Sequence, residues 1–144
     1  MKINYHNRQF VGVLNSPNGQ VNGDTFFHYE QHEAILTGTY HGGSILKGHI
    51  LGRVNDDSSL YFTYHHLDTH HQLKSGSCYS RPKMLPDGRI QLHESWEWTH
   101  GGAGEGESVV EEVQCQRTQD YCTEYRLLIT DYSQPLPHYL EKNE

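Results

Sequence analysis

The sequence has few cysteines, no long apolar run and no basic segment. Its three cysteines, Cys78, Cys115 and Cys122, form an odd set without a CxxC pair, which counts against a disulfide framework and a structural zinc site. No stretch approaches the ~20 apolar residues of a membrane-spanning helix. Residues 1–14 lack the apolar core of a signal peptide. We therefore expect a cytoplasmic protein that does not enter a membrane.

Positive charge is also scarce. The chain has 11 Lys and Arg residues against 18 Asp and Glu residues, which gives a net charge of −7. Binding to the phosphate backbone requires a concentrated positive face, so we expect no nucleic-acid partner. A length of 144 residues suits one domain with one hydrophobic core.

Alternation is the dominant pattern of the sequence. Apolar and aromatic residues recur at every second position in short runs, and clusters of Gly, Asn and Asp separate these runs, as is typical of strands joined by tight turns. We predict turns at 15–19, 41–43, 55–58 and 86–88. The predicted strands cover residues 9–14, 25–30, 34–40, 44–54, 59–66, 73–81, 89–99 and 108–117.

The predicted connections are too short for crossover helices, so neighbouring strands should be antiparallel. We predict an all-β fold: a closed or nearly closed up-and-down barrel of about eight strands, lipocalin- or avidin-like, whose interior holds side chains or one small ligand. A ninth run at 123–131 still alternates, and Pro135 and Pro137 then prevent regular pairing. The prediction is one barrel domain over 1–132 and a C-terminal tail over 133–144.

The inner face of each strand follows from its alternation. In the run 89–99 one face carries Ile90, Leu92, Glu94, Trp96 and Trp98, and this apolar face should point inward. An interior with aromatic side chains on one wall and small side chains on the other is either a packed core or a pocket. The same test places inside the barrel Thr25, Phe27, Tyr29, Leu46, Gly48, Ile50, Gly52, Val54, Leu60, Phe62, Tyr64, His66, Gly76, Cys78 and Ser80.

Glu94 is the most informative of these residues. A carboxylate inside a small barrel costs several kcal/mol unless it is paired, hydrogen-bonded or protonated. We predict Tyr29, Tyr64 and His66 as its partners. Glu94 would then be a general acid or base or a ligand anchor, a structural carboxylate that holds tyrosine hydroxyls, or a residue that reaches water at an open end.

Three functions remain open at this point. The first is a binding protein for a small, partly apolar molecule, with Glu94 or His66 fixing the polar end of the ligand. The second is an enzyme with Glu94, His66 and Tyr64 as catalytic acid and base. The third is a structural or interaction protein with a filled core, whose outer face mediates homo-oligomer formation. The predicted ligand-binding residues are Phe27, Tyr29, Tyr40, Phe62, Trp96 and Trp98.

Two other segments suggest chemistry at first sight. Residues 65–71 gather four histidines and one aspartate, a donor set that suits zinc, nickel or copper. This segment straddles a strand end and a loop, so we expect solvated histidines and no metal. The glycine-rich segment 100–107 has no following Lys and contains two glutamates, so we expect a hairpin loop and not a phosphate-binding loop. No cofactor is expected.

A family resemblance covers residues 25–112. It is carried by the segments FHY at 27–29, TYHGGSI at 39–45, LHESWEWT at 92–99 and EGES at 105–108. The chain resembles a family of short bacterial proteins, many of which are labelled n-acetylglutamate synthase. That label implies acetyl transfer from acetyl-CoA, which uses a Gln/Arg-x-x-Gly-x-Gly/Ala loop before a helix. The sequence contains neither, so we predict that the protein does not bind acetyl-CoA.

Overall fold

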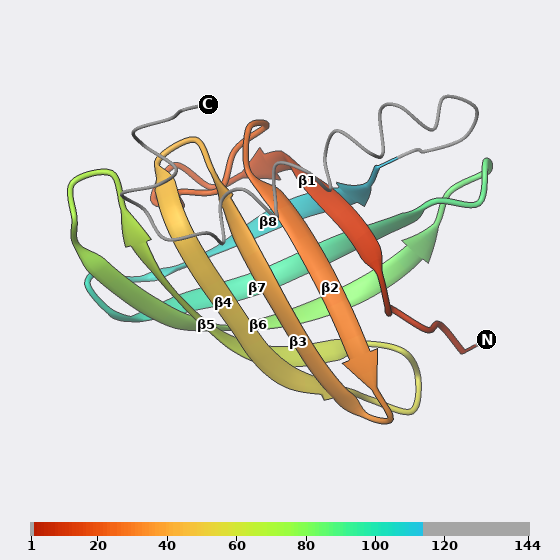
Figure 1. The fold of residues 1–144 in the computed structure, drawn as a ribbon. Helices are drawn as coiled ribbons and strands as arrows, with labels where there is room; N and C mark the ends of the chain where they lie inside the picture. Colours follow the sequence, from red (N-terminus) through yellow and green to blue (C-terminus); the bar gives the residue numbers. More distant parts are fainter. Residues whose placement is uncertain (1, 114–144) are drawn as a thin grey trace, which may run out of the picture. The chain divides into compact units, whose positions relative to one another are not determined.

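A computed structural model of the chain describes residues 2–113. This part of the chain is built from eight strands, which follow one another around a closed barrel (Figure 1). It contains no helix that could span a membrane. The strands are β1 (Arg8–Asn15), β2 (Phe26–His32), β3 (Ile35–Gly42), β4 (Ile45–Val54), β5 (Leu60–Asp68), β6 (Leu73–Met84), β7 (Ile90–His100) and β8 (Glu105–Glu112).

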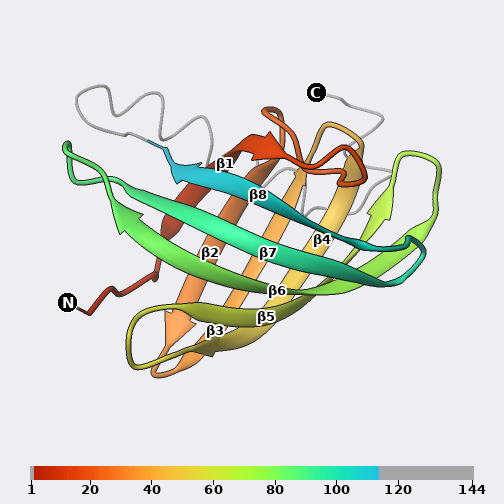
Figure 2. The same cartoon turned by 180° about the vertical axis from the view of Figure 1, so that it is seen from behind.

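Each strand pairs antiparallel with the next, and β8 pairs with β1 to close the barrel (Figure 2). The predicted all-β up-and-down barrel is therefore confirmed. At the seam the register shifts between Gly12 and Leu14, a β-bulge of the kind that bends a strand. Arg8 Nη1 lies 2.9 Å from Glu112 Oε2 across the same seam.

The predicted limits of the last strand need correction. β8 begins at Glu105 and not at residue 108, so half of the glycine-rich segment belongs to β7 or β8 and residues 101–104 form the loop. Gly106 pairs with Trp96, and a Cβ atom at Gly106 would meet the Trp96 ring, so glycine is what allows β8 to pair there. The predicted strand end at 114–117, the ninth run and the tail lie outside the described residues.

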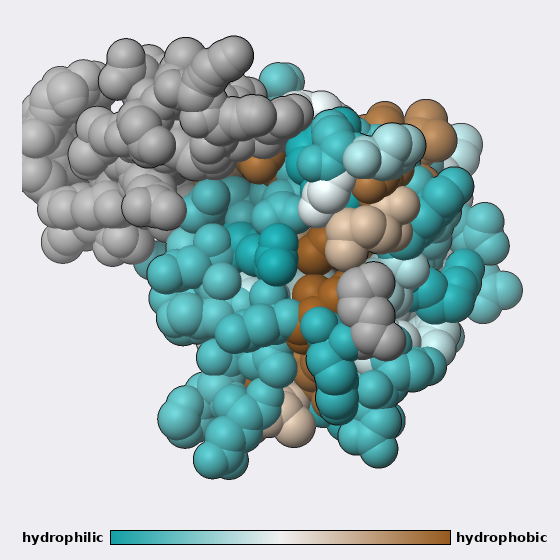
Figure 3. All heavy atoms as spheres, turned by 90° about the vertical axis from the view of Figure 1, so that its right-hand side faces the viewer, coloured by the Kyte–Doolittle hydropathy of each residue, from teal (hydrophilic) through white to brown (hydrophobic). Residues whose placement is uncertain are grey.

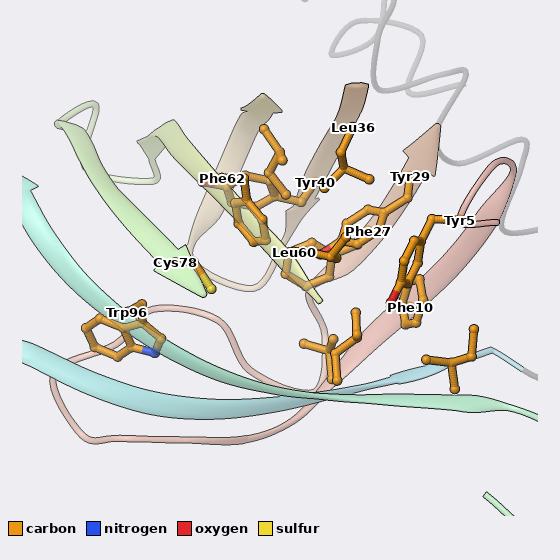
Figure 4. Packing of buried hydrophobic residues seen from close by; sticks show 14 of the residues in the cluster. Tyr5, Phe10, Phe27, Tyr29, Leu36, Tyr40, Leu60, Phe62, Cys78 and Trp96 are labelled. Carbon is orange, nitrogen blue, oxygen red and sulfur yellow. The ribbon is translucent and has the colours of Figure 1, made fainter. Parts of the chain in front are cut away.

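The predicted inner faces are confirmed with one exception. Leu46 was expected inside, but Ile45 is the buried residue and Leu46 is half-buried. The register of β4 against β5 shifts between Ile45 and Lys47, and this irregularity turns the start of β4 by one residue. The buried core combines aliphatic residues with Tyr5, Phe10, Phe27, Tyr29, Tyr40, Phe62 and Trp96 (Figure 4).

Glycines on neighbouring strands make room for the large rings of the interior. In each case the glycine is the cross-strand partner of an aromatic residue, and a Cβ atom on it would overlap the aromatic side chain. The barrel therefore admits rings that two ordinary facing side chains would exclude. The pairs are Tyr40 with Gly48, Tyr64 with Gly76, and Trp96 with Gly106.

The segment before β1 closes one end of the barrel, which the sequence did not predict. Tyr5 is fully buried and its hydroxyl donates a hydrogen bond to the Ser58 carbonyl at 2.6 Å. The Ile3 amide donates to Ser58 Oγ at 2.8 Å. Figure 3 shows the side of the molecule at the right of Figure 1, where hydrophilic residues surround a narrow band of hydrophobic ones. The residues before β1 are thus fixed to the loop between β4 and β5.

Candidate functional site

The other end of the barrel holds a cavity of about 50 Å³. Drug-sized ligands occupy pockets of roughly 300–1,000 Å³, so this cavity suits a much smaller molecule. Side chains of the barrel wall and of the β1–β2 loop line it together. The lining residues are Asn15, Gly19, Gln20, Val21, Phe27, Tyr40, Ile50, Phe62, Tyr64, His66, Cys78, Glu94, Trp96, Trp98 and Ser108.

Aromatic rings form most of the cavity wall. Trp96 and Trp98 of β7 lie with their ring centroids 5.6 Å apart, and the Trp98 and Tyr64 centroids are 5.8 Å apart. Figure 4 shows Trp96 on the opposite side of the interior from Phe62 and Phe27. A ligand in the cavity would therefore contact ring surfaces on more than one side.

Most polar atoms on these rings already have protein partners. The Tyr64 hydroxyl donates to the Glu97 carbonyl at 3.1 Å, and Trp98 Nε1 donates to the Asn18 carbonyl at 3.0 Å. The Tyr40 hydroxyl lies 2.8 Å from His66 Nδ1. Trp96 Nε1 has no hydrogen-bond partner within residues 2–113. The rings thus offer a ligand mainly their apolar surfaces.

Glu94 provides the carboxylate of the cavity. Its side chain is buried, Ser80 Oγ donates to Oε2 at 3.0 Å, and Ser108 Oγ donates to Oε1 at 2.9 Å. Burial raises the pKa of Glu94 to about 7, although the hydrogen bonds from Ser108 and Ser80 lower it. Near neutral pH the carboxylate therefore divides between its charged and neutral forms.

The predicted partners of Glu94 were wrong. The two serines hold its carboxylate, and none of the three predicted partners does, because Ser80 and Ser108 are its cross-strand neighbours on β6 and β8. Residues directly opposite in a sheet share a face and lie closest to one another. The inward position of Ser80 was predictable from alternation, but the strand register that places it beside Glu94 was not.

The other groups that face Glu94 are uncharged at neutral pH. They are Tyr29 of β2, Tyr64 of β5 and Cys78 of β6. Burial is the main cause that raises the pKa of each of them, and the nearby Glu94 charge raises it further. No Lys or Arg side chain is among the residues that line the cavity. The Glu94 carboxylate therefore has hydrogen-bond donors but no positive partner in the described part of the chain.

His66 connects the barrel wall to the β1–β2 loop. Gln20 Nε2 donates to Asp68 Oδ2 at 3.2 Å, which leaves Gln20 Oε1 to accept from His66 Nε2 at 2.7 Å. His66 Nδ1 then accepts from the Tyr40 hydroxyl. Burial lowers the pKa of His66 to about 4, so the imidazole is neutral at pH 7.

Asp68 anchors this chain of hydrogen bonds at the end of β5. Although its burial raises the pKa, hydrogen bonds from the Gln72 amide, the Gln20 side chain and the His70 amide hold the pKa of Asp68 below its usual value. Lys74 Nζ lies 4.0 Å from Asp68 Oδ2. Asp68 is therefore a charged structural acceptor for the loop.

The β1–β2 loop, residues 16–25, covers the mouth of the barrel and was missed as a functional element. Besides Gln20, it is fixed by Asn18, whose carbonyl accepts from Trp98, and by Ser16, whose amide donates to the Glu107 carbonyl at 3.0 Å. The composition of the loop does not indicate a functional role. Its length could have indicated one, because the gap between the strands predicted at 9–14 and 25–30 was the longest connection between consecutive predicted strands.

The histidine-rich segment does not form a cluster. His66 points into the barrel, whereas His65, His70 and His71 are exposed. Within residues 2–113 no three His, Cys, Asp or Glu side chains gather to hold a metal ion.

A family model described as avidin-like protein matches residues 3–113, which covers the whole described barrel. The chain belongs to the avidin-like family. Searches of curated proteins and of solved structures gave no match. The family match agrees with the closed barrel of eight antiparallel strands. It neither supports nor opposes the n-acetylglutamate synthase label.

In this avidin-like barrel the predicted site residues meet in one place, with one exception. Glu94, His66 and Tyr64 line the cavity, but no hydrogen bond joins any two of them. Tyr29 is buried outside the cavity lining, and its hydroxyl has no partner within the described residues. The remaining predicted ligand-binding residues, Phe27, Tyr40, Phe62, Trp96 and Trp98, all line the cavity.

Proposed function

We propose that this protein binds a small, partly apolar molecule in the cavity between the barrel wall and the β1–β2 loop. The ligand would lie against the rings of Trp96, Trp98 and Phe27, and Glu94 would hold its polar group. One observation carries the proposal: a buried carboxylate that has no positive partner within residues 2–113 lines an aromatic cavity. A ligand would supply the interaction that this carboxylate lacks.

The family supports the same function. Avidin-like barrels bind small ligands, and this chain matches the family over nearly all of its described residues. An acid–base enzyme has less support, because the polar atoms of His66 and Tyr64 already form hydrogen bonds. His66 bonds to Gln20 and Tyr40, and Tyr64 donates to the Glu97 carbonyl. A filled-core protein has less support too, because a buried carboxylate lines a cavity and has no positive partner within residues 2–113.

The test is native mass spectrometry of the purified full chain, followed by titration with a panel of single-ring and short-chain amines, amides and alcohols, read by tryptophan fluorescence. Cys78→Leu should fill the cavity and abolish binding, because Cys78 lines the cavity beside its cross-strand partner Trp96. Ser77→Leu places the same side chain on the outer face of β6 and should bind as the wild type does. Equal binding by both variants would contradict the proposal.

A further inference from the structure

We propose that the ligand of this cavity is a small organic cation, an ammonium or guanidinium group that pairs with Glu94 among the aromatic rings. The inference rests on the proposed function and specifies the chemical class of the ligand. It would assign to the cavity a charge preference that the family match alone does not give.

The first argument is charge. Among residues 2–113, Glu94 is the one carboxylate that lines the cavity, and no Lys or Arg lines it. His66, the remaining basic group, is held neutral by burial. An anionic ligand would meet a like charge there, whereas a cation would meet the opposite one. The chain as a whole carries a net charge of −7, which also favours the approach of cations.

The second argument is that the Glu94 carboxylate can accept more hydrogen bonds than it receives. Each of its oxygens accepts one serine hydroxyl, and an ionised carboxylate accepts about four hydrogen bonds. A buried charge with donors but no counter-charge is strongly destabilising, and a bound cation would remove that cost. An ammonium or guanidinium group has several N–H donors for the free acceptor positions.

The third argument is the aromatic wall. The faces of Trp, Tyr and Phe rings attract cations, and Trp rings do so most strongly. The Trp98 ring already has one such contact, because Lys74 Nζ lies 5.7 Å from its centroid. Lys74 itself is outside the cavity lining and lies beside Asp68, so it does not neutralise Glu94. The rings of Trp96, Trp98 and Tyr64 therefore suit a cation bound at Glu94.

A neutral urea or amide is the competing ligand class. Trp96 Nε1 lacks an acceptor within residues 2–113, so it could donate to a carbonyl oxygen while Glu94 accepts an N–H group. Methylguanidinium and methylurea separate the two classes, because they have nearly the same planar shape and differ in charge. Both are added to the full-length protein at constant ionic strength below denaturing concentrations, and tryptophan fluorescence reports binding.

The cation proposal predicts saturable binding of methylguanidinium at least tenfold tighter than that of methylurea. The groups facing Glu94 are two serines, Tyr29, Tyr64 and Cys78, none of which is charged between pH 6 and pH 8. Because the pKa of Glu94 is about 7, methylguanidinium should bind roughly tenfold tighter at pH 8 than at pH 6. Glu94→Gln should abolish the preference for the cation, and Glu97→Gln on the exposed part of β7 should preserve it.

Three results would overturn the cation proposal: equal or tighter binding of methylurea, binding of methylguanidinium that Glu94→Gln leaves unchanged, or no saturable binding below about 100 mM. If methylurea binds more tightly, the small-ligand function stands and only the charge class is wrong. If neither probe binds, the cation proposal fails, and the amine, amide and alcohol panel decides the proposed function separately. The pH dependence of the wild type keeps the test valid even if Glu94→Gln does not fold.

Discussion

His66 Nε2 donates a hydrogen bond to Gln20 Oε1 at 2.7 Å, and this bond ties strand β5 to the loop that covers the cavity. Gln20 also donates to Asp68 Oδ2 at 3.2 Å, so one side chain bridges two residues of the same strand. The loop is thus held closed by a glutamine that spans a neutral imidazole and a charged carboxylate.

Replacement of Gln20 should loosen the loop and leave the barrel intact. Gln20→Ala removes both hydrogen bonds of the bridge, so we expect a loss of about 1–2 kcal/mol in the free energy of unfolding. Amide exchange should accelerate in residues 16–25 and stay unchanged in the paired strands. Hydrogen-exchange mass spectrometry measures both effects.

The control for this variant is Gln72→Ala. Gln72 lies in the neighbouring β5–β6 loop, where its side chain is exposed and its backbone amide makes the bond to Asp68. An alanine retains that amide, so exchange in residues 16–25 should match the wild type. Equal acceleration by both substitutions would show that Gln20 is not what holds the loop.

Glu94 should make the folded protein less stable as the pH rises. The folded pKa of about 7 lies above the usual value of 4.5, so between these pH values the folded state binds more protons than the unfolded state. Protonation of Glu94 therefore stabilises the folded state by about 3 kcal/mol below pH 4.5, and this contribution is lost as the pH rises through 7. Glu94→Gln removes this dependence, and the variant should be more stable than the wild type at pH 8.

Urea denaturation of both proteins at pH 5 and pH 8 tests this prediction. Taking the difference between the two proteins at each pH cancels the contribution of His66, which titrates in the same range and acts in the opposite direction. A stability difference that does not change between pH 5 and pH 8 would mean that Glu94 keeps its ordinary pKa. A loss of stability at both pH values would instead identify Glu94 as a structural acceptor for Ser80 and Ser108.

Alternation explains why the interior of this barrel was predictable. Side chains point to opposite faces with a period of two whatever the neighbouring strands are, so Glu94, Trp96 and Trp98 could be placed inside from β7 alone. The same rule misplaced Leu46, since a local irregularity at the start of β4 breaks the period.

The hydrogen-bond partners were beyond this reasoning, because they depend on contacts between distant parts of the chain. Glu94 meets Ser108 through the register of β7 against β8, and no local pattern fixes that register. The hydrogen bond between Gln20 and His66 joins residues 46 positions apart in the sequence, and the one between Tyr5 and Ser58 joins residues 53 positions apart. The loop and the N-terminal segment carry no periodicity, so only the folded chain shows what they cover.

His66 should stay neutral well below the pH at which an ordinary histidine is protonated. Burial lowers its pKa from 6.5 to about 4. The neutral ring therefore stabilises the folded state above pH 6.5, and this contribution is lost as the pH falls toward 4. NMR titration of the His66 ring protons should give a midpoint below pH 5. A midpoint near 6.5 would mean that the loop leaves His66 open to water.

Any side chain at position 76 should destabilise the fold, because Tyr64 occupies the space beside Gly76. A Cβ atom at Gly76 would overlap both the Tyr64 hydroxyl and the Glu97 carbonyl, which are hydrogen-bonded to each other. Gly76→Ala must displace the ring or separate β6 from β7, and we expect a loss of roughly 1–3 kcal/mol in the free energy of unfolding.

Gly23→Ala is the matched control for this substitution. A Cβ atom there would have only the Gly12 carbonyl oxygen nearby, at 3.9 Å, so it fits without displacement. This variant should be as stable as the wild type or slightly more stable, because alanine restricts the unfolded chain. Chemical denaturation of both variants gives the comparison, and the Gly76 variant should also bind cavity ligands more weakly, since Tyr64 lines the cavity. Equal stability of the two variants would show that the pairing of Tyr64 with Gly76 does not determine the packing of this wall.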